Sequence, residues 1–272
     1  MQDKVVVITG AAQGFGEGVA MILSDEGAKI VIADLNAEKG GKVTADINGR
    51  HGKGRAIFVR TDVSDENSVR GLMDETVRQF GRIDTLISNA GILRVGDLDS
   101  ISAEDLDAVA AVNYRGYFLC AKYASKIMKK QTAAEPDYYA DIIQINSKSG
   151  LCGSKANFAY SGSKFGAIGL TQSFALELAP YRIKVNSICP GNFLDGPLWS
   201  DPENGLLTQY LNAGKVPGAK TVDQVKEYYL SKVPMHKGCT PLDIARAVMY
   251  AVEQTGETGQ AIPVTGGQVM LG

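Results

Sequence analysis

Short apolar runs rich in valine and isoleucine alternate along the chain with longer amphipathic segments. Several of the runs are apolar almost throughout, as strands buried on both faces of a sheet are. The predicted strands lie at residues 4–10, 28–34, 55–63, 83–91, 141–150, 183–191 and 259–267. The predicted helices lie at residues 15–26, 36–49, 65–80, 103–130, 157–178 and 240–254. This alternation predicts an α/β fold with a seven-stranded parallel sheet, doubly wound and covered by helices on both faces.

One interval, residues 192–239, departs from the alternation of strand and helix. It contains four prolines around two short predicted helices, at residues 203–213 and 221–232. A connection of that length inside a compact domain is usually a lid or a binding insertion. The alternative is a structural excursion that packs against a neighbouring subunit. With no internal repeat, linker or break in composition, residues 1–272 are predicted to form a single Rossmann-type domain that carries a small helical substrate lid.

The overall composition is that of an ordinary soluble protein, with 44% hydrophobic and 21% charged residues. A formal net charge of -2 gives no electrostatic reason to expect nucleic acid or an anionic membrane as a partner. The first apolar run is far shorter than a signal sequence or a membrane span. The 4 cysteines are widely separated and only 2 histidines are present, so no metal site is expected. We therefore predict a cytoplasmic protein.

A glycine-rich segment, TGAAQGFG, follows the first predicted strand. Its glycines are Gly10, Gly14 and Gly16, which do not have the strict G-x-G-x-x-G spacing. Glycines at a strand-to-helix turn nevertheless let the backbone turn tightly and approach a pyrophosphate at the start of the helix. The segment therefore predicts a dinucleotide-binding loop.

Asp34 ends the second predicted strand, eighteen residues after Gly16. A carboxylate at this place can accept hydrogen bonds from both hydroxyls of the adenosine ribose and repels a 2′-phosphate. Neither Gln13 nor Leu35 provides a positive charge for that phosphate. The predicted cofactor is therefore NAD and not NADP.

Tyr160 and Lys164, in the segment YSGSKFG, lie one turn apart on one face of a predicted helix. A free phenol has a pKa of about 10, so a tyrosine that acts near neutral pH needs stabilisation of roughly 4 kcal/mol. A positive charge about 4 Å away supplies that much at an effective dielectric constant near 20. We predict that Lys164 lowers the pKa of Tyr160, which then acts as the base in alcohol oxidation and the acid in carbonyl reduction.

Ser147 lies at the end of the fifth predicted strand, at the edge where doubly wound sheets bind ligands, and its hydroxyl is placed to bond the reacting oxygen. Each residue taken alone has a simpler explanation. A Y-x-x-x-K pair occurs by chance on many helices. In the simpler explanation, Ser147 is only a turn residue, and Asn113 only caps or bends the helix at 103–130. The set, in this order and together with the glycine loop, predicts an active enzyme.

These motifs in order, with NAG at residues 89–91, resemble the short-chain dehydrogenase/reductase family over essentially the whole chain. The resemblance implies that Lys164 binds the nicotinamide ribose and that Asn113 holds a water that relays the proton. The implied catalytic residues are Asn113, Ser147, Tyr160 and Lys164. The implied cofactor-binding residues are Gly10, Gln13, Gly14, Phe15, Gly16, Asp34, Asp62, Val63, Asn89, Ala90, Gly91, Tyr160, Lys164, Pro190 and Gly191.

Two positions depart from the pattern of the resembled family. Ser88 precedes NAG where the family often has asparagine. Asp195 stands where the family often has a threonine that helps to hold the cofactor's carboxamide. The resemblance therefore leaves the carboxamide contact open.

Segments such as IIQINSKSG and DQVKEYYLSKVP are similar to a group within the family that acts on sorbitol 6-phosphate. This implies oxidation of D-sorbitol 6-phosphate to D-fructose 6-phosphate, with Ser147 and Tyr160 contacting the substrate. A phosphorylated substrate requires cations. Those expected to bind it are Lys148 and Lys155, with Arg94 as a third candidate and His236-Lys237 as a weaker one. The aromatic residues expected at the pocket wall are Trp199, Tyr210, Tyr228 and Tyr229.

Several alternatives remain open from the sequence. Lys148 and Lys155 are equally typical of a solvated surface, in which case the substrate is an unphosphorylated polyol or a hydroxysteroid. A non-catalytic dinucleotide sensor and an acyl-carrier reductase share the same fold. The resemblance also implies a homo-oligomer, a dimer or tetramer, joined through helices 103–130 and 157–178.

Overall fold

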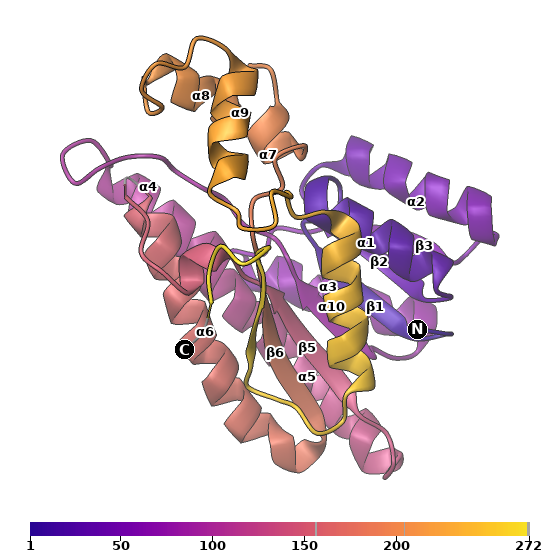
Figure 1. Cartoon of the computed structure of the whole chain (residues 1–272). Helices are drawn as coiled ribbons and strands as arrows, with labels where there is room; N and C mark the ends of the chain where they lie inside the picture. The colour runs from indigo at the N-terminus through magenta and orange to yellow at the C-terminus, as the bar shows by residue number, and fades with distance from the viewer. Residues whose placement is uncertain (156, 204, 271–272) are drawn as a thin grey trace.

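The computed structural model describes residues 1–155, 157–203 and 205–270 (Figure 1). Seven parallel strands form one sheet in the order β3-β2-β1-β4-β5-β6-β7, which confirms the predicted architecture. The strands are β1 (Val5–Thr9), β2 (Lys29–Asp34), β3 (Ala56–Arg60), β4 (Thr85–Ser88), β5 (Ala140–Ile145), β6 (Ile183–Pro190) and β7 (Ala261–Val264). Several strands are shorter than predicted, because residues 61–63, 89–91 and 146–150 leave the sheet as loops at its carboxyl edge.

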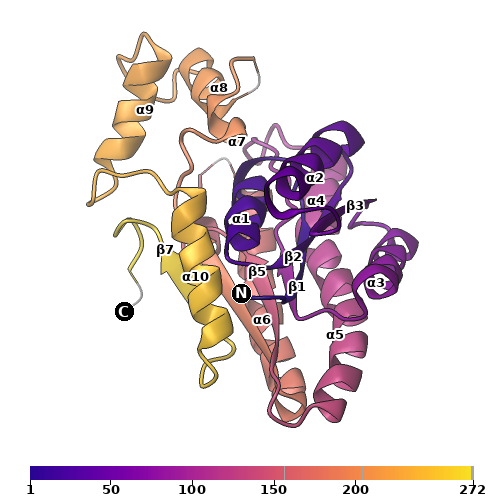
Figure 2. The ribbon, with the colours of Figure 1, turned by 90° about the vertical axis from the view of Figure 1, so that its right-hand side faces the viewer.

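Helices cover both faces of the sheet (Figure 2). One apolar cluster packs the sheet against α1 (Gly14–Asp25), α2 (Ala37–His51) and α10 (Pro241–Glu253). A second cluster packs the other face against α3 (Glu66–Phe80), α5 (Gly116–Ala134) and α6 (Phe158–Leu178). Burial on both faces explains why most strands are apolar along their whole length.

The helix predicted at 103–130 is not continuous, so that expectation is wrong in detail. It consists of α4 (Ala103–Ala110), a π-helical turn η1 (Ala111–Arg115) and α5, which extends to residue 134. Such widened turns interrupt the regular hydrogen-bond ladder and are frequent at functional sites. This one contains Asn113, whose side chain is bonded outside the helix. Short 3-10 turns, η2 (Lys148–Gly150) and η3 (Ala179–Tyr181), follow β5 and α6.

The strand order reverses between β1 and β4, which pair side by side. Chain connections on the two sides of such a switch point run in opposite directions and leave a crevice outside the carboxyl ends of the strands. All predicted site residues up to Gly191 lie at or near this edge. The fold therefore gathers segments that are far apart in the sequence around one crevice.

Residues 192–239 form a separate lid above that edge (Figure 1). It contains α8 (Leu206–Asn212) and α9 (Val222–Ser231), close to the two predicted helices, and a short α7 (Pro197–Ser200) that was not predicted. The lid has its own small apolar core. Its two ends meet, because the main-chain N–H of Cys239 donates to the carbonyl of Asn192 at 2.8 Å.

Candidate active site

A cavity of about 1020 Å³ lies between the carboxyl edge of the sheet and the lid. Its wall includes most of the residues that the sequence pointed to. These are Gly10, Gln13, Gly14, Phe15, Asp34, Asp62, Val63, Asn89, Ala90, Gly91, Ser147, Lys148, Lys155, Tyr160, Lys164, Pro190 and Gly191. Two predicted residues, Gly16 and Asn113, do not line the cavity but contact residues that do.

The glycine loop is built as a phosphate-sized turn. Gly10 and Gly14 have φ of +63° and +66°, a conformation that favours glycine. A Cβ on Gly16 would lie 2.3 Å from the carbonyl oxygen of Gly10, so this glycine is needed for packing within the turn. The Asn89 side chain donates to the same carbonyl at 2.9 Å and ties the loop to the end of β4.

The first turn of α1 is well suited to an anion. No side chain caps this end of the helix, since Gln13 at the cap position makes no cap hydrogen bond. The N–H groups of the first turn have no partner within the helix, and Gly14 and Phe15 line the cavity there. A helix start of this kind attracts a phosphate group. The donors present therefore fit a dinucleotide pyrophosphate.

Asp34 is fixed at the end of β2. Its carboxylate accepts from the main-chain N–H groups of Ala12 at 3.0 Å and Asn36 at 2.9 Å, and it lines the cavity. Lys39 also lines the cavity and donates to the Gln13 side chain at 2.8 Å. The sequence reasoning missed this lysine because it considered only positions adjacent to the loop and to Asp34.

Asn113 is 2% exposed and braces the turn after β4. Its side chain accepts from the N–H of Ile92 at 2.8 Å and donates to the carbonyl of Ile92 at 2.9 Å. It also donates to the hydroxyl of Ser163, on α6, at 3.1 Å. The Asn113 side chain therefore joins η1, the segment after β4 and α6.

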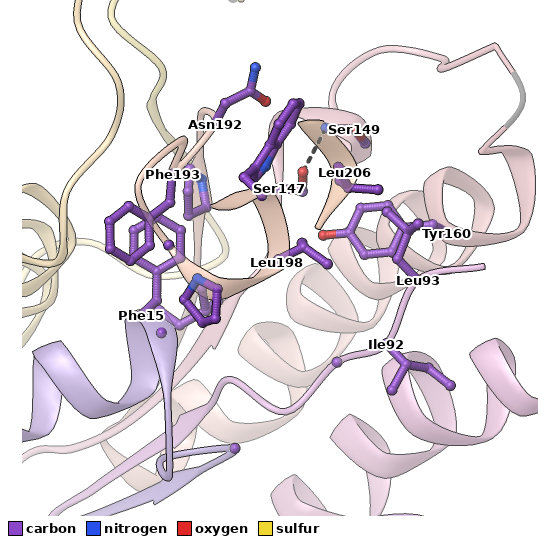
Figure 3. A pocket seen from close by; sticks show the side chains of 18 of the residues that line it. Phe15, Ile92, Leu93, Ser147, Ser149, Tyr160, Asn192, Phe193, Leu198 and Leu206 are labelled. Carbon is purple, nitrogen blue, oxygen red and sulfur yellow. Dashed lines mark hydrogen bonds between the residues drawn. The ribbon is translucent and has the colours of Figure 1, made fainter. Parts of the chain in front are cut away.

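Ser147 and Tyr160 lie near each other on the cavity wall (Figure 3). Ser147 lies two residues after the end of β5, and its hydroxyl oxygen accepts from the N–H of Ser149 at 3.1 Å. Tyr160 extends from the first turn of α6 with its phenolic oxygen directed toward Ser147. Burial raises the pKa of the Tyr160 phenol, and a hydrogen bond with Ser147 lowers it.

Lys164 lies one turn after Tyr160, on the predicted shared face, with its Nζ 5.6 Å from the centre of the phenol ring. The side chain is 3% exposed, and its Nζ donates to the carbonyl oxygen of Ile145 at 2.9 Å. Burial lowers the pKa of this ammonium group to about 8. The prediction that the pKa of Tyr160 is lowered is wrong for the protein without a cofactor, because desolvation of the phenol raises this pKa.

The predicted substrate cations divide into two groups. Lys148 and Lys155 line the cavity, and Arg94 does so while paired with Asp105 at 3.1 Å. Lys237 instead pairs with Asp243 at 2.9 Å and, like its neighbour at position 236, does not line this cavity. Two lid lysines that were not predicted, at positions 215 and 232, line it as well. Lys232 lies in the segment DQVKEYYLSKVP, which is similar to the sorbitol 6-phosphate group, but this similarity did not single out the lysine.

Aromatic side chains form the upper wall. Trp199, Tyr210 and Tyr229 pack as a cluster, with the Trp199 ring 5.1 Å from that of Tyr229 and 5.9 Å from that of Tyr210. They line the cavity, as predicted, and also form part of the lid core. Phe15 and Phe193 stack with ring centres 4.8 Å apart, joining the dinucleotide loop to the base of the lid (Figure 3).

Asp195 does not face this cavity. Its side chain is exposed and forms an ion pair with Lys226 of α9 at 2.5 Å. Asn192 is 7% exposed and lines the cavity, and its side-chain NH₂ has no hydrogen-bond partner among the described residues. The amide donor available to a ligand at this turn is therefore that of Asn192.

In the part of the chain that the structure describes, no helix is long and apolar enough to cross a membrane. In the same residues, histidine, cysteine and acidic side chains do not gather in groups that could hold a metal ion.

The sequence model of the short chain dehydrogenase family matches residues 4–201, and the chain belongs to this family of oxidoreductases. Sorbitol-6-phosphate 2-dehydrogenase of Escherichia coli is 39% identical over 99% of this chain and 100% of that protein. The crystal structure of sorbitol-6-phosphate 2-dehydrogenase from Erwinia amylovora has a TM-score of 0.90 and 38% identity, and the match covers 98% of this chain and 100% of that one. A 3-ketoacyl-(acyl-carrier-protein) reductase from Brucella melitensis, complexed with NADH, has a TM-score of 0.84 and 26% identity over 99% of both chains.

These comparisons confirm the predicted family and the prediction of a nicotinamide-dependent dehydrogenase that acts on a CH–OH group. The cavity provides what such a reaction needs from the protein. Gly14 and the start of α1 fit a pyrophosphate, and the Asp34 carboxylate and the Tyr160 phenol both line the cavity. When bound, the nicotinamide supplies the hydride acceptor or donor.

Proposed function

We propose that the protein catalyses the NAD-dependent interconversion of D-sorbitol 6-phosphate and D-fructose 6-phosphate. The observation that carries this proposal is the presence of Lys148 and Lys155 on the wall of the cavity that also contains Tyr160. An unphosphorylated polyol has no use for two ammonium groups there. Full-length similarity to two sorbitol-6-phosphate 2-dehydrogenases supports the same substrate.

In the oxidation direction, Tyr160 accepts the proton of the alcohol hydroxyl, while a hydride leaves the carbon that carries this hydroxyl. The alcohol would thereby be oxidised to a ketone, with a bound nicotinamide supplying the hydride acceptor. The hydroxyl of Ser147 forms a hydrogen bond with the reacting oxygen and holds it beside the phenol. Because burial raises the pKa of Tyr160, the positive charges of Lys164 and of the oxidised nicotinamide must together stabilise the phenolate.

NAD is the proposed cofactor because Asp34 places a carboxylate at the adenosine end of the cavity. Two main-chain N–H groups hold it, so the charge stays where a 2′-phosphate would be repelled. Lys39 is nearby, but its ammonium group bonds to Gln13. Steady-state rates with NAD and NADP test this preference directly, and equal kcat/KM for the two would contradict it.

Kinetics with two substrates test the proposed reaction. The enzyme is assayed with NAD and either D-sorbitol 6-phosphate or D-sorbitol. We expect a much higher kcat/KM for the phosphorylated substrate, and an increase in its KM when Lys148 or Lys155 is replaced by alanine. Equal turnover of both polyols, unaffected by Lys148→Ala and Lys155→Ala, would exclude the phosphate as a determinant and favour an unphosphorylated polyol.

The assembly and location of the protein also remain proposals. We propose a homo-oligomer joined through η1, α5 and α6, because Tyr114, Phe118, Phe165 and Leu176 expose apolar surface there. We expect it to act in the cytoplasm. Light scattering of the purified protein tests the oligomer, and a monomer at micromolar concentration would contradict it.

A further inference from the structure

The lid brings a second pair of lysines to the substrate end of the cavity. Lys215 lies between α8 and α9, and Lys232 directly follows α9. Neither forms an ion pair with any residue that the structure describes, and the same is true of Lys148 and Lys155 on the body. Four ammonium groups thus line the cavity, and none of them belongs to an ion pair in the described part of the chain.

Contacts within the lid hold its two lysines around one aromatic cluster. The Nζ of Lys215 lies 4.2 Å from the centre of the Tyr210 ring, and that of Lys232 lies 4.0 Å from the centre of the Tyr228 ring. Tyr229 packs against both of these rings, with centre-to-centre distances of 5.6 and 5.5 Å. These rings support the charges of both lysines through cation–π contacts.

Lys148 of the body and Lys232 of the lid are close enough to affect each other. The positive charge of Lys232 adds to burial in lowering the pKa of Lys148. Burial likewise lowers the pKa of Lys215. Mutual repulsion across the gap between lid and body is unfavourable until an anion enters between them. The electrostatics of the region therefore favour a ligand that carries more than one negative charge.

Other charges near this end are already engaged. Arg94 pairs with Asp105. Asp201, the lid carboxylate that lines the cavity, accepts from the N–H of Glu203 at 3.0 Å. These contacts leave Lys148, Lys155, Lys215 and Lys232 as the charged groups with capacity for a ligand anion.

We propose that Lys215 and Lys232 complete a phosphate-monoester site with Lys148 on the body, so that the phosphate of the substrate bridges the lid to the body. The inference rests on the proposed function, since it assigns the phosphate of that substrate to a place in the cavity. A lysine binds phosphate as a point charge with three donors, and no fixed fork geometry is needed. The lid then recognises the end of the substrate remote from the reacting carbon.

Charge-removing variants test the site. Lys215→Gln and Lys232→Gln are compared with Lys220→Gln, an exposed lid lysine outside the cavity wall. A hydrogen bond to a charged group is worth about 1.5–3 kcal/mol, so each site variant should lose roughly 10- to 100-fold in kcat/KM for D-sorbitol 6-phosphate. The rate with free D-sorbitol and all rates of the control should stay within about twofold of wild type.

A binding measurement separates failure of this site from failure of the proposed reaction. Calorimetry with inorganic phosphate needs no turnover, and the affinity should fall in Lys232→Gln but not in Lys220→Gln. If wild type ignores D-sorbitol 6-phosphate yet binds phosphate through Lys232, the proposed function fails and the anion site stands. Equal losses on both polyols, or no loss on either, would overturn the lid site.

Discussion

The two walls of the active-site cavity are built in different ways. The body wall consists of strand ends and tight loops that continue a sheet buried on both faces, and Gly10 and Asp34 are fixed by main-chain contacts. The lid wall consists of side chains on short helices around a core of their own, dominated by rings such as Trp199. The shape of the body wall, which faces the cofactor, therefore depends on backbone geometry. The shape of the lid wall, which faces the substrate, depends on which side chains the lid carries. A change on one wall should therefore leave the function of the other largely intact.

The largest expected effect comes from removing the acid–base group of the body. Tyr160→Phe keeps the ring and removes the hydroxyl, and kcat should fall by about 10²- to 10⁴-fold. NADH affinity, followed by its fluorescence, should change little. Tyr228→Phe on the lid wall is the matched control and should keep most of the rate. An unchanged rate in Tyr160→Phe would favour a dinucleotide sensor over an enzyme.

Core deletions compare the stability of body and lid. Leu86→Ala, in β4, should lower the free energy of unfolding by about 2–5 kcal/mol and reduce the melting temperature. Leu207→Ala, in the lid core, removes a side chain of the same type and similar burial. Because the lid can open locally, its loss should appear mainly as a higher KM and less as a lower melting temperature. Equal shifts in melting temperature would show one cooperative unit.

The buried Lys164 ammonium group predicts a pH-dependent stability specific to the body. Its pKa falls from 10.5 to about 8 on folding, so between these values the unfolded chain binds more protons. Stability should therefore rise with pH across this window, by roughly 3 kcal/mol from this group. Below about pH 8 the folded protein carries the full cost. Buried thiols such as Cys120, whose pKa is raised, contribute in the opposite direction in both proteins. In urea unfolding the change in stability from pH 7 to pH 10 should therefore be more favourable in wild type than in Lys164→Met, and the same slope in both proteins would contradict the assignment.

Removing the ion pair at the base of the lid should have the smallest effect on activity. Asp195 and Lys226 are 76% and 35% exposed in their side chains, and exposed pairs contribute at most about 1 kcal/mol. In a double-mutant cycle, Asp195→Asn and Lys226→Met should change KM for the polyol by no more than a few-fold, with unchanged NADH affinity. A larger loss of NADH affinity in Asp195→Asn would show that the two walls are coupled.

The fold and motifs of the body could be predicted because they depend on short, continuous stretches of sequence. Apolar runs mark strands that are buried on both faces, and the glycine turn and the four-residue spacing of Tyr160 and Lys164 follow from backbone geometry. The π-helical turn could not be predicted, since it accompanies bonds from Asn113 to Ile92, twenty-one residues away. The raised pKa of Tyr160 depends on burial, which only the assembled fold determines.

The lid was predicted as an insertion with aromatic residues at the pocket wall, but its two cavity lysines were not predicted. The helix at 222–231 begins with a capping box at Thr221, whereas the helix at 206–212 has no side-chain cap. Which lysines face the cavity depends on how these helices pack, and the sequence spacing of Lys215 and Lys232 carries no motif. Side-chain direction on a short, irregular segment is set by tertiary packing.

The hydrogen bond between Cys239 and Asn192 holds the two ends of the lid together, so the chain leaves the body and returns to it at one place. The forty-odd residues between them therefore span almost no distance, and the separation of β6 from α10 does not depend on their number or identity. Evolution or an engineer can exchange this segment for a longer, shorter or differently charged one while the redox machinery beneath keeps its dimensions. The substrate range can therefore change while the contacts that hold the nucleotide stay the same.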